Sequence, residues 1–138
     1  MHNILLSLQS DLQVADYIDL LCRSTLAARR PIDDVPRMEG MLRNADIIAT
    51  ARGDDGRLIG LARAITDYHF CTYLADLAVD QRHQRQGIGK RLIDFVHQTA
   101  GKQTTIIVLA APAAVDYYGH IGMTRHDSCW IGKAEPQG

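Results

Sequence analysis

A glycine-containing turn near the middle of the chain separates a strand-like run from a helix-like run. The turn at residues 84–89 reads Gln-Arg-Gln-Gly-Ile-Gly, and the residues before it, 70–79, have strand composition. From Gly87 to Ala100 the apolar residues recur at helical spacing, and 104–109 is a β-branched and apolar run typical of a strand buried on both faces. A strand, a turn, a helix and a second strand in this order predict a parallel crossover.

The residues before this crossover predict two helices. Asp11 is a candidate cap for a helix that runs through about Arg23, because apolar residues follow it at helical spacing. A second helix is predicted to begin at Asp33 or Asp34 and to end at Asn44. Both helices precede the part of the sequence that carries most of the strand-like runs.

Strand-like runs occur at residues 3–8, 47–51 and 58–65, in addition to the run before the turn. The segment 53–56, Gly-Asp-Asp-Gly, joins two of them and permits positive φ angles, so it predicts a hairpin. These runs therefore predict an antiparallel meander that continues into the crossover.

Downstream of the crossover, Pro112 opens a short helix through about His120, and 123–131 has the composition of a last strand. The whole pattern predicts a mixed α/β (α+β) fold, in which helices flank a mostly antiparallel central sheet with one βαβ crossover. With 138 residues, of which 46% are hydrophobic, the chain has the size and composition of a single domain spanning 1–138.

Charge and cysteine content argue against several classes of function. The formal net charge is -1 with both signs interspersed, so we expect neither a nucleic-acid nor a membrane-surface partner. Cys22, Cys71 and Cys129 are odd in number and far apart, which indicates no disulfide framework and no metal site. No apolar stretch reaches the roughly 18 residues of a membrane span, and no cationic segment precedes residues 4–6, so we expect a cytoplasmic protein.

The turn at 84–89 is suited to bind a phosphate. Gly87 and Gly89 let backbone N–H groups converge without Cβ crowding, and a helix N-terminus adds about half a positive charge. A dinucleotide fingerprint would need glycine in place of Leu92, and a P-loop would need glycine in place of Gln84, so both fail. The alternative is that the glycines only shape a tight strand-to-helix turn.

Two segments together resemble the GNAT superfamily of N-acetyltransferases. Leu77-Ala78-Val79-Asp80 followed by Gln84-x-x-Gly87-x-Gly89 is similar to the superfamily's central motif, Gln or Arg, x, x, Gly, x, Gly or Ala. Residues 114–123, Ala-Val-Asp-Tyr-Tyr-Gly-His-Ile-Gly-Met, are similar to its second landmark, Ala-x-x-aromatic-Tyr-x-x-x-Gly-Phe. The predicted order of elements resembles the GNAT fold along nearly the whole chain, although residues 1–45 match only in pattern.

The resemblance implies acetyl-coenzyme A as co-substrate and no metal. In the superfamily the loop amides hold the pyrophosphate, and the preceding strand pairs with the pantetheine arm. Ala111 stands where many members have an asparagine that contacts this arm, so backbone contacts from Leu109 and Ala110 are expected instead. Arg85 and Lys90 are expected near the phosphates, although they could equally be solvated surface. The implied cofactor-binding residues are Leu77, Ala78, Val79, Gln84, Arg85, Gln86, Gly87, Ile88, Gly89, Lys90, Ala110 and Tyr118.

The resemblance also implies a general acid. Tyr118 falls on the tyrosine that commonly protonates the departing thiolate in the superfamily, whereas Tyr117 is expected to fill the core side of the same helix. The alternative for Tyr118 is a packed aromatic residue whose hydroxyl is hydrogen-bonded. A backbone N–H of the strand at 77–79 is the expected donor to the thioester carbonyl, because related enzymes splay this strand at a bulge.

The general base is less well indicated. Asp76 is the nearest carboxylate and could accept the proton of the amine, but an ion pair at a strand irregularity is an alternative. Ala75 stands where polyamine-acetylating members have a glutamate, which is a departure from that pattern. His69 and His120 are further candidates, because an imidazole titrates near neutral pH.

The implied function is transfer of an acetyl group to an amine, expected to belong to a small molecule, with a protein amine left open. The acceptor is expected to enter near the turn at 67–69, where Arg29 and Arg30 could recognise a carboxylate or form an exposed helix end. Trp130 and Cys129 could line the same cleft or a dimer seam.

Other classes of function stay open at this point. A coenzyme A-binding sensor or scaffold without turnover is conceivable, because Ala75 and Ala111 depart from the superfamily pattern. A generic nucleotide-binding domain is disfavoured by the failed glycine spacings. Many superfamily members pair as homodimers, but no heptad or long apolar stripe marks an interface in this sequence, so the oligomeric state is also open.

Overall fold

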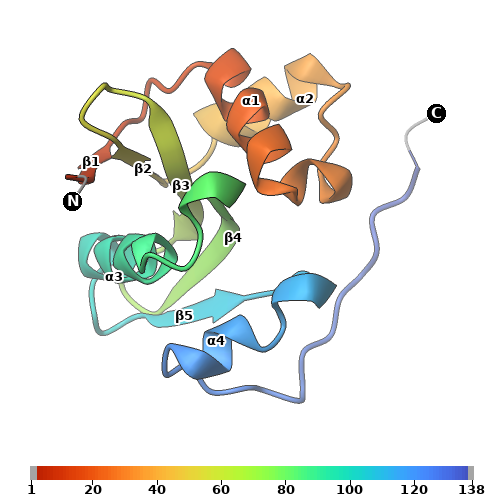
Figure 1. Ribbon diagram of the computed structural model, residues 1–138. Coiled ribbons are helices and arrows are strands. Elements are labelled where there is room, and N and C mark those ends of the chain that lie inside the picture. The colour runs from red at the N-terminus through yellow and green to blue at the C-terminus, as the bar shows by residue number, and fades with distance from the viewer. Residues whose placement is uncertain (1–2, 137–138) are drawn as a thin grey trace.

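The computed structural model describes residues 3–136, which form one five-stranded sheet in the order β1-β2-β3-β4-β5 (Figure 1). Neighbouring strands are antiparallel except β4 and β5, which are parallel. The predicted mixed fold with a mostly antiparallel sheet and one parallel crossover is therefore confirmed. The strands are β1 (Leu5–Leu8), β2 (Ile47–Arg52), β3 (Leu58–Thr66), β4 (Cys71–Val79) and β5 (Thr105–Val108).

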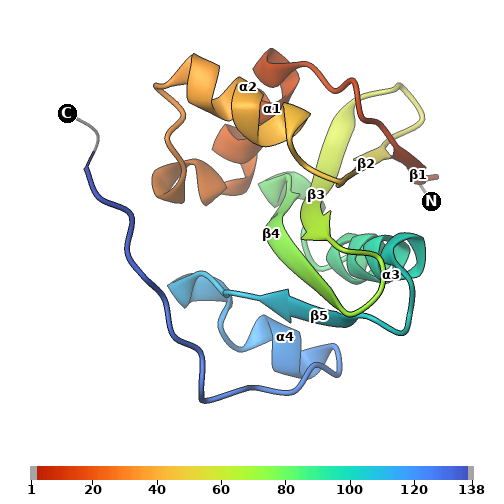
Figure 2. The same cartoon turned by 180° about the vertical axis from the view of Figure 1, so that it is seen from behind.

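Helices cover the two faces of the sheet unequally (Figures 1 and 2). The N-terminal pair α1 and α2 packs on one face, α3 packs on the other, and α4 lies beside β5. The helices are α1 (Val14–Ser24), α2 (Val35–Arg43), α3 (Ile88–Ala100) and α4 (Tyr117–His120), with 3-10 turns at Leu26–Arg29, Gln81–His83 and Pro112–Ala114.

Two hydrophobic clusters hold these layers together. One lies under α3, where Leu92 and Val96 pack against the sheet. The other lies under α1 and α2, where Leu20, Met38 and Leu61 are fully buried. Each helix contributes one apolar stripe, because residues three and four apart share a face. The helical spacing in the sequence identified the buried face of α3, whereas in α1 the fully buried Tyr17 and Leu20 were not picked out by it.

The helix caps agree with the prediction at one helix and differ at the other. The Asp34 carboxylate accepts a hydrogen bond from the Arg37 N–H at 3.2 Å, and Asn44 is the C-cap of α2. The predicted cap at Asp11 is wrong, because α1 begins at Val14. Leu12, between these two positions, is fully buried. Its side chain therefore enters the core before the helix begins.

The C-terminal part differs most from the prediction. The strand β5 is not buried on both faces, since Ile106 and Val108 pack against the cluster under α3 while Ile107, on the opposite face, is 46% exposed. The strand predicted at 123–131 is absent, and residues 123–136 run as an extended segment in which Trp130 is 92% exposed (Figure 1). A strand requires a ladder partner, whereas the hydrogen bonds of this segment, such as that between Ser128 and His126, are local.

A β-bulge at Ala75 decides which way the side chains of β4 point. Arg63 pairs with Asp76 and Ala64 pairs with Leu74, so Ala75 is the extra residue. Because the bulge inserts one residue, the side chains on its two sides alternate between the faces of the sheet out of step by one position. Leu74 consequently packs into the cluster under α3, while the side chain of Asp76 lies on the opposite face, against α1.

Candidate active site

The parallel strands β4 and β5 run side by side only over their first residues. Their pairing begins with Cys71 opposite Thr105 and ends with Leu74 opposite Val108. From Ala75 onward, no described residue pairs with β4 on this side, and Figure 1 shows the two strands diverging. We call residues 75–79 on this side the open edge. Its backbone N–H and C=O groups are available to an extended ligand arm.

The predicted phosphate-binding turn lies where the open edge ends. Gly87 has φ 80° and precedes α3, whose first helical bond runs from the Arg91 N–H to the Gly87 carbonyl at 3.1 Å. Within residues 3–136, the N–H groups of Gly87, Ile88 and Gly89 donate no hydrogen bond. We call these three groups the N–H cradle. Together with the positive end of α3 they form an anion-binding arrangement.

Tyr117 contacts this cradle. A Cβ added to Gly89 would come within 2.5 Å of the Tyr117 hydroxyl, so only a glycine fits the present arrangement. Burial raises the pKa of Tyr117, whereas the nearby Lys90 charge acts in the opposite direction. Tyr117 was predicted to fill the core. Its ring does pack against the α3 cluster, but its hydroxyl reaches the first turn of α3.

We expect Gly89→Ala to reduce stability by about 1–3 kcal/mol, because the new methyl group overlaps the Tyr117 hydroxyl. Tyr117→Phe should relieve this loss, since the nearest remaining ring atom, Cζ, stands at 3.4 Å from the added Cβ. The double variant would therefore unfold at a denaturant concentration closer to that of Tyr117→Phe alone. Strictly additive losses in urea titrations would show that the overlap is not the cause.

Tyr118 lies next to Tyr117 at the start of α4. The two rings make an edge-to-face contact with centroids 5.3 Å apart, and both pack against the cluster under α3. The Tyr118 hydroxyl makes no hydrogen bond to the described residues, yet it is not sealed from solvent. Burial raises the pKa of Tyr118, so the phenol stays protonated at neutral pH. A proton donor without an internal partner is thus placed beside the residue that contacts the cradle.

Asp76 stands on the other face of the sheet at the centre of a buried polar cluster. Its carboxylate accepts from Arg63 Nε at 2.6 Å and from Arg30 Nε at 2.7 Å, and Tyr17 donates its hydroxyl to the same carboxylate. Arg30 also donates to the carbonyl of the bulged residue Ala75 at 2.8 Å. We call Tyr17, Arg30, Arg63 and Asp76 the arginine cluster.

These surroundings argue against the predicted role of Asp76 as the base. The residue is 1% exposed, and both carboxylate oxygens already accept hydrogen bonds. Burial alone would raise the pKa of Asp76, but the hydrogen bonds and charges of Arg63 and Arg30 hold it below its usual range. A carboxylate with a lowered pKa and no free lone pair toward solvent is a weak proton acceptor. The contacts of Asp76 agree with the alternative prediction, an ion pair at a strand irregularity.

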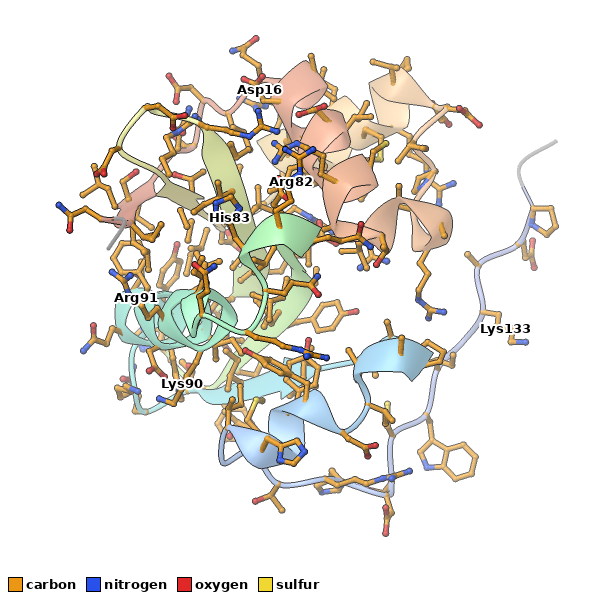
Figure 3. All side chains as sticks on the ribbon, viewed as in Figure 1. Asp16, Arg82, His83, Lys90, Arg91 and Lys133 are labelled. Carbon is orange, nitrogen blue, oxygen red and sulfur yellow. The ribbon has the colours of Figure 1, made fainter. Side chains whose placement is uncertain are left out.

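The other predicted cofactor-binding residues lie in β4, in the loop before α3, in the first turn of α3 and just after β5. Lys90 pairs with Asp94 at 2.9 Å, and Arg91 donates to the Ile4 carbonyl at 3.2 Å. Figure 3 shows both side chains on α3, with Arg82 and His83 on the loop that follows β4. The Gln84 amide donates to the Val79 carbonyl at 3.3 Å. Of the remaining residues, Leu77, Val79 and Ala110 are half-buried and Ala78 and Ile88 are buried. Arg85 and Gln86 are exposed.

Several residues considered from the sequence lie away from this site or carry no special environment. His69 and His120 are exposed, at the turn before β4 and at the end of α4. Arg29 is exposed, whereas its neighbour Arg30 turns inward to the arginine cluster. Cys129 is exposed on the extended C-terminal segment.

Sequence reasoning missed Tyr17 and Arg63. Arg63 interrupts an otherwise apolar strand, and a charged residue in such a run is rarely buried without a partner. Asp76 in the next strand is the matching signal. The bulge at Ala75, which brings the two residues opposite each other, leaves no mark in the hydrophobic pattern.

Comparison with known families identifies the arrangement. A family model described as the acetyltransferase (GNAT) family matches residues 14–123, which include the crossover, the open edge, the N–H cradle and Tyr118. This chain belongs to the GNAT family of acetyltransferases. The predicted superfamily resemblance is thereby confirmed.

The GNAT relatives extend this comparison to sequences and solved structures. Histone acetyltransferase TAP1 of Glycine max is 30% identical over 147 residues, which include 98% of this chain but only 58% of that protein. A GNAT family acetyltransferase from Streptococcus pneumoniae TIGR4 has a TM-score of 0.74 at 20% identity, covering 96% of this chain and all of the other. Aminoglycoside N-acetyltransferase AAC(6')-Iy, solved with coenzyme A, has a TM-score of 0.72 at 18% identity and covers 99% and 97%.

Neither a membrane-spanning helix nor a metal-binding cluster of side chains is found within residues 3–136. None of the helices there is both long enough and apolar enough to span a bilayer. No group of three or more histidine, cysteine, aspartate or glutamate side chains in this range is arranged to hold a metal ion.

Proposed function

We propose that this GNAT domain transfers the acetyl group of acetyl-coenzyme A to the amine of a small molecule. The observation that carries the proposal is the N–H cradle at the end of the open edge, because unpaired backbone donors at a helix N-terminus are suited to a pyrophosphate. The pantetheine arm would then lie along residues 75–79, with its thioester toward the point where β4 leaves β5.

The chemistry assigned to the chain is direct attack. The lone pair of a neutral amine forms the new C–N bond at the thioester carbonyl while a backbone N–H of the open edge stabilises the oxygen. The C–S bond then breaks, the Tyr118 hydroxyl protonates the departing thiolate, and the amine nitrogen releases its proton to water. The products are an N-acetyl amine and coenzyme A, and water reprotonates Tyr118.

We assign no side-chain base, because Asp76 is enclosed by Tyr17, Arg30 and Arg63. A nearby positive charge also lowers the pKa of an amine, which raises its neutral fraction at a given pH. The arginine cluster can therefore assist deprotonation without accepting the proton itself.

Support for a small-molecule acceptor comes from the fold neighbour that is an aminoglycoside N-acetyltransferase, whereas the relative from Glycine max is a histone acetyltransferase. Because the chain spans 58% of the latter protein, further parts of that relative have no counterpart in this comparison. We therefore favour the small molecule.

A matched pair of glycine variants tests the cradle. Gly87 and Gly56 both have φ 80°, and a Cβ added to either meets no atom within 4 Å, but only Gly87 lies in the cradle. We expect Gly87→Ala to weaken acetyl-coenzyme A binding at least about 10-fold, because the methyl group keeps the phosphates away from the N–H groups. Gly56→Ala carries the same backbone strain, about 1–2 kcal/mol, and should leave binding unchanged.

Isothermal titration calorimetry measures both variants against the wild-type chain, and release of free thiol with a panel of amines measures turnover. Absence of acetyl-coenzyme A binding by the folded wild-type chain would refute the proposal. Binding without thiol release for any amine would instead indicate a coenzyme A sensor.

A further inference from the structure

The arginine cluster carries more positive charge than its internal ion pairs neutralise. Arg30 and Arg63 each bear one positive charge, and Asp76 supplies one negative charge. Tyr17 remains neutral, because burial and the neighbouring Asp76 carboxylate raise its pKa. One positive charge is therefore left uncompensated on the α1 side of the sheet, opposite the face on which α3 lies. An excess charge in a largely buried position favours an anionic partner.

The two guanidinium groups also retain donors. Arg63 uses Nε for Asp76, and its Nη1 and Nη2 groups donate no hydrogen bond within residues 3–136. Neither nitrogen is sealed from solvent without a partner. Arg30 donates from Nη1 to the Arg29 carbonyl and from Nη2 to the Ala75 carbonyl, which leaves one N–H on each nitrogen.

The cluster stands at the boundary of the helix-covered part of the sheet. On one side of it, Leu61 and Ala78 are buried under α1 and α2. On the other side, the paired residues Ile65 and Tyr73 are 48% and 38% exposed. We call Ile65, Tyr73 and Ile107 the uncovered strip; Tyr73 pairs with Ile65 in β3 and with Ile107 in β5. A molecule on this strip meets guanidinium groups at one end.

The same place adjoins the proposed reaction centre. Arg30 holds the carbonyl of Ala75, the bulged residue at which β4 parts from β5. An anionic group bound by Arg30 would hence lie beside the bulge that borders the opening between these strands. Guanidinium groups match the planar shape of a carboxylate and bind it with charge-assisted hydrogen bonds.

We propose that Arg30 and Arg63 bind the carboxylate of the acceptor, which is accordingly an α-amino acid whose apolar side chain rests on the uncovered strip. This inference rests on the proposed acetyl transfer and names the acceptor for the same site. Asp76 and Tyr17 act as positioning residues, because they hold both guanidinium groups through the carboxylate. Acceptors with several positive charges are disfavoured by the uncompensated charge.

Three matched acceptors test the carboxylate. With saturating acetyl-coenzyme A, thiol release is measured for L-phenylalanine, L-phenylalaninamide and phenethylamine, which share the ring and the amine but differ in the carboxylate. The three acceptors are compared at one pH, with kcat/KM calculated from the concentration of the neutral amine. We expect this kcat/KM to be at least about 10-fold higher for phenylalanine than for the other two.

Lysine variants connect this preference to the cluster. Arg63→Lys and Arg30→Lys keep the positive charge beside Asp76 but lose the planar fork, and each should reduce the preference for phenylalanine about 10-fold. Binding of acetyl-coenzyme A should stay unchanged in calorimetry. Arg37→Lys, on the exposed surface of α2, is the matched control and should keep the full preference. If Arg63→Lys does not fold, Arg30→Lys, whose side chain is 21% exposed, carries the test.

Equal or faster acetylation of phenylalaninamide or phenethylamine would overturn the proposal while leaving acetyl transfer intact. Failure to acetylate any of the common amino acids, with acetyl-coenzyme A bound, would overturn it as well. An unchanged preference in a folded Arg30→Lys and Arg63→Lys would refute the assignment to these two residues. Absence of acetyl-coenzyme A binding by the folded wild-type chain is a separate outcome, which would refute the proposed function itself.

Discussion

Replacing Tyr118 with phenylalanine is expected to lower kcat by about 10²- to 10⁴-fold, the usual contribution of a positioned general acid. The ring that contacts Tyr117 remains, so packing against the α3 cluster should change little. Only the hydroxyl, which has no partner within residues 3–136, is removed. Acetyl-coenzyme A affinity should therefore stay within about 3-fold of the wild-type value, since the N–H cradle is intact. Steady-state assays of thiol release measure kcat, and calorimetry measures the affinity for acetyl-coenzyme A.

Tyr117→Phe is the matched control, because it removes a hydroxyl from the adjacent residue on the same short helix. The Tyr117 hydroxyl lies beside Gly89, at the cradle rather than along the open edge. We expect this variant to change acetyl-coenzyme A affinity and to leave kcat largely unaltered. If Tyr117→Phe lost turnover and Tyr118→Phe kept it, the general acid would be Tyr117, and an unchanged rate in both would remove the tyrosine mechanism.

Replacing Asp76 with asparagine is expected to reduce the free energy of unfolding by about 3–5 kcal/mol at neutral pH, the typical effect of breaking a buried ion pair. Arg63 would remain largely buried with its charge no longer balanced, and Arg30 would lose its partner at the bulge. Asp94→Asn is the control, because Asp94 pairs with Lys90 at 2.9 Å but both side chains are about half exposed. That change should be less than about 1 kcal/mol in urea titrations.

The Asp76 effect should depend on pH in a defined direction. The pKa of Asp76 is lower in the folded chain than the ordinary value of 3.8, so the unfolded chain takes up a proton first as the pH falls. The stabilisation is thus fully present above about pH 5 and is lost as the pH falls below about 4 toward the folded pKa. The wild-type chain and Asp76→Asn should accordingly converge in stability under acid conditions. A constant difference between pH 7 and pH 3 would contradict the ion-pair assignment.

The elements that local patterns govern were predictable from the sequence. The helical spacing from Gly87 to Ala100 and the glycines at 53–56 act over a few residues, and the structure has α3 and the β2–β3 hairpin there. The cradle was predictable for the same reason, since two glycines at the start of a helix determine where its N–H groups point. Such signals need no knowledge of distant contacts.

The parts that long-range pairing governs were not predictable. Periodicity makes 104–109 look like a central strand, but β5 has a partner on one side only in the described chain, so Ile107 is exposed. The composition of 123–131 suits a strand, yet the segment finds no ladder. Asp76 was singled out as a base because the bulge at Ala75, which directs it toward Arg63 and Arg30, depends on the register between two strands.

The carboxylate of Asp76 ties the choice of substrate to the integrity of the fold. A substitution that adapts Arg30 or Arg63 to a different acceptor also disturbs the ion pairs of Asp76 with these two arginines, which join the loop after α1 to β3 and β4, and the carboxylate that accepts from Tyr17 of α1. Selection for new acceptors would for this reason act more readily on the uncovered strip than on the arginines. Ile65, Tyr73 and Ile107 can vary in size without exposing a buried charge, so diversification of this domain should concentrate there.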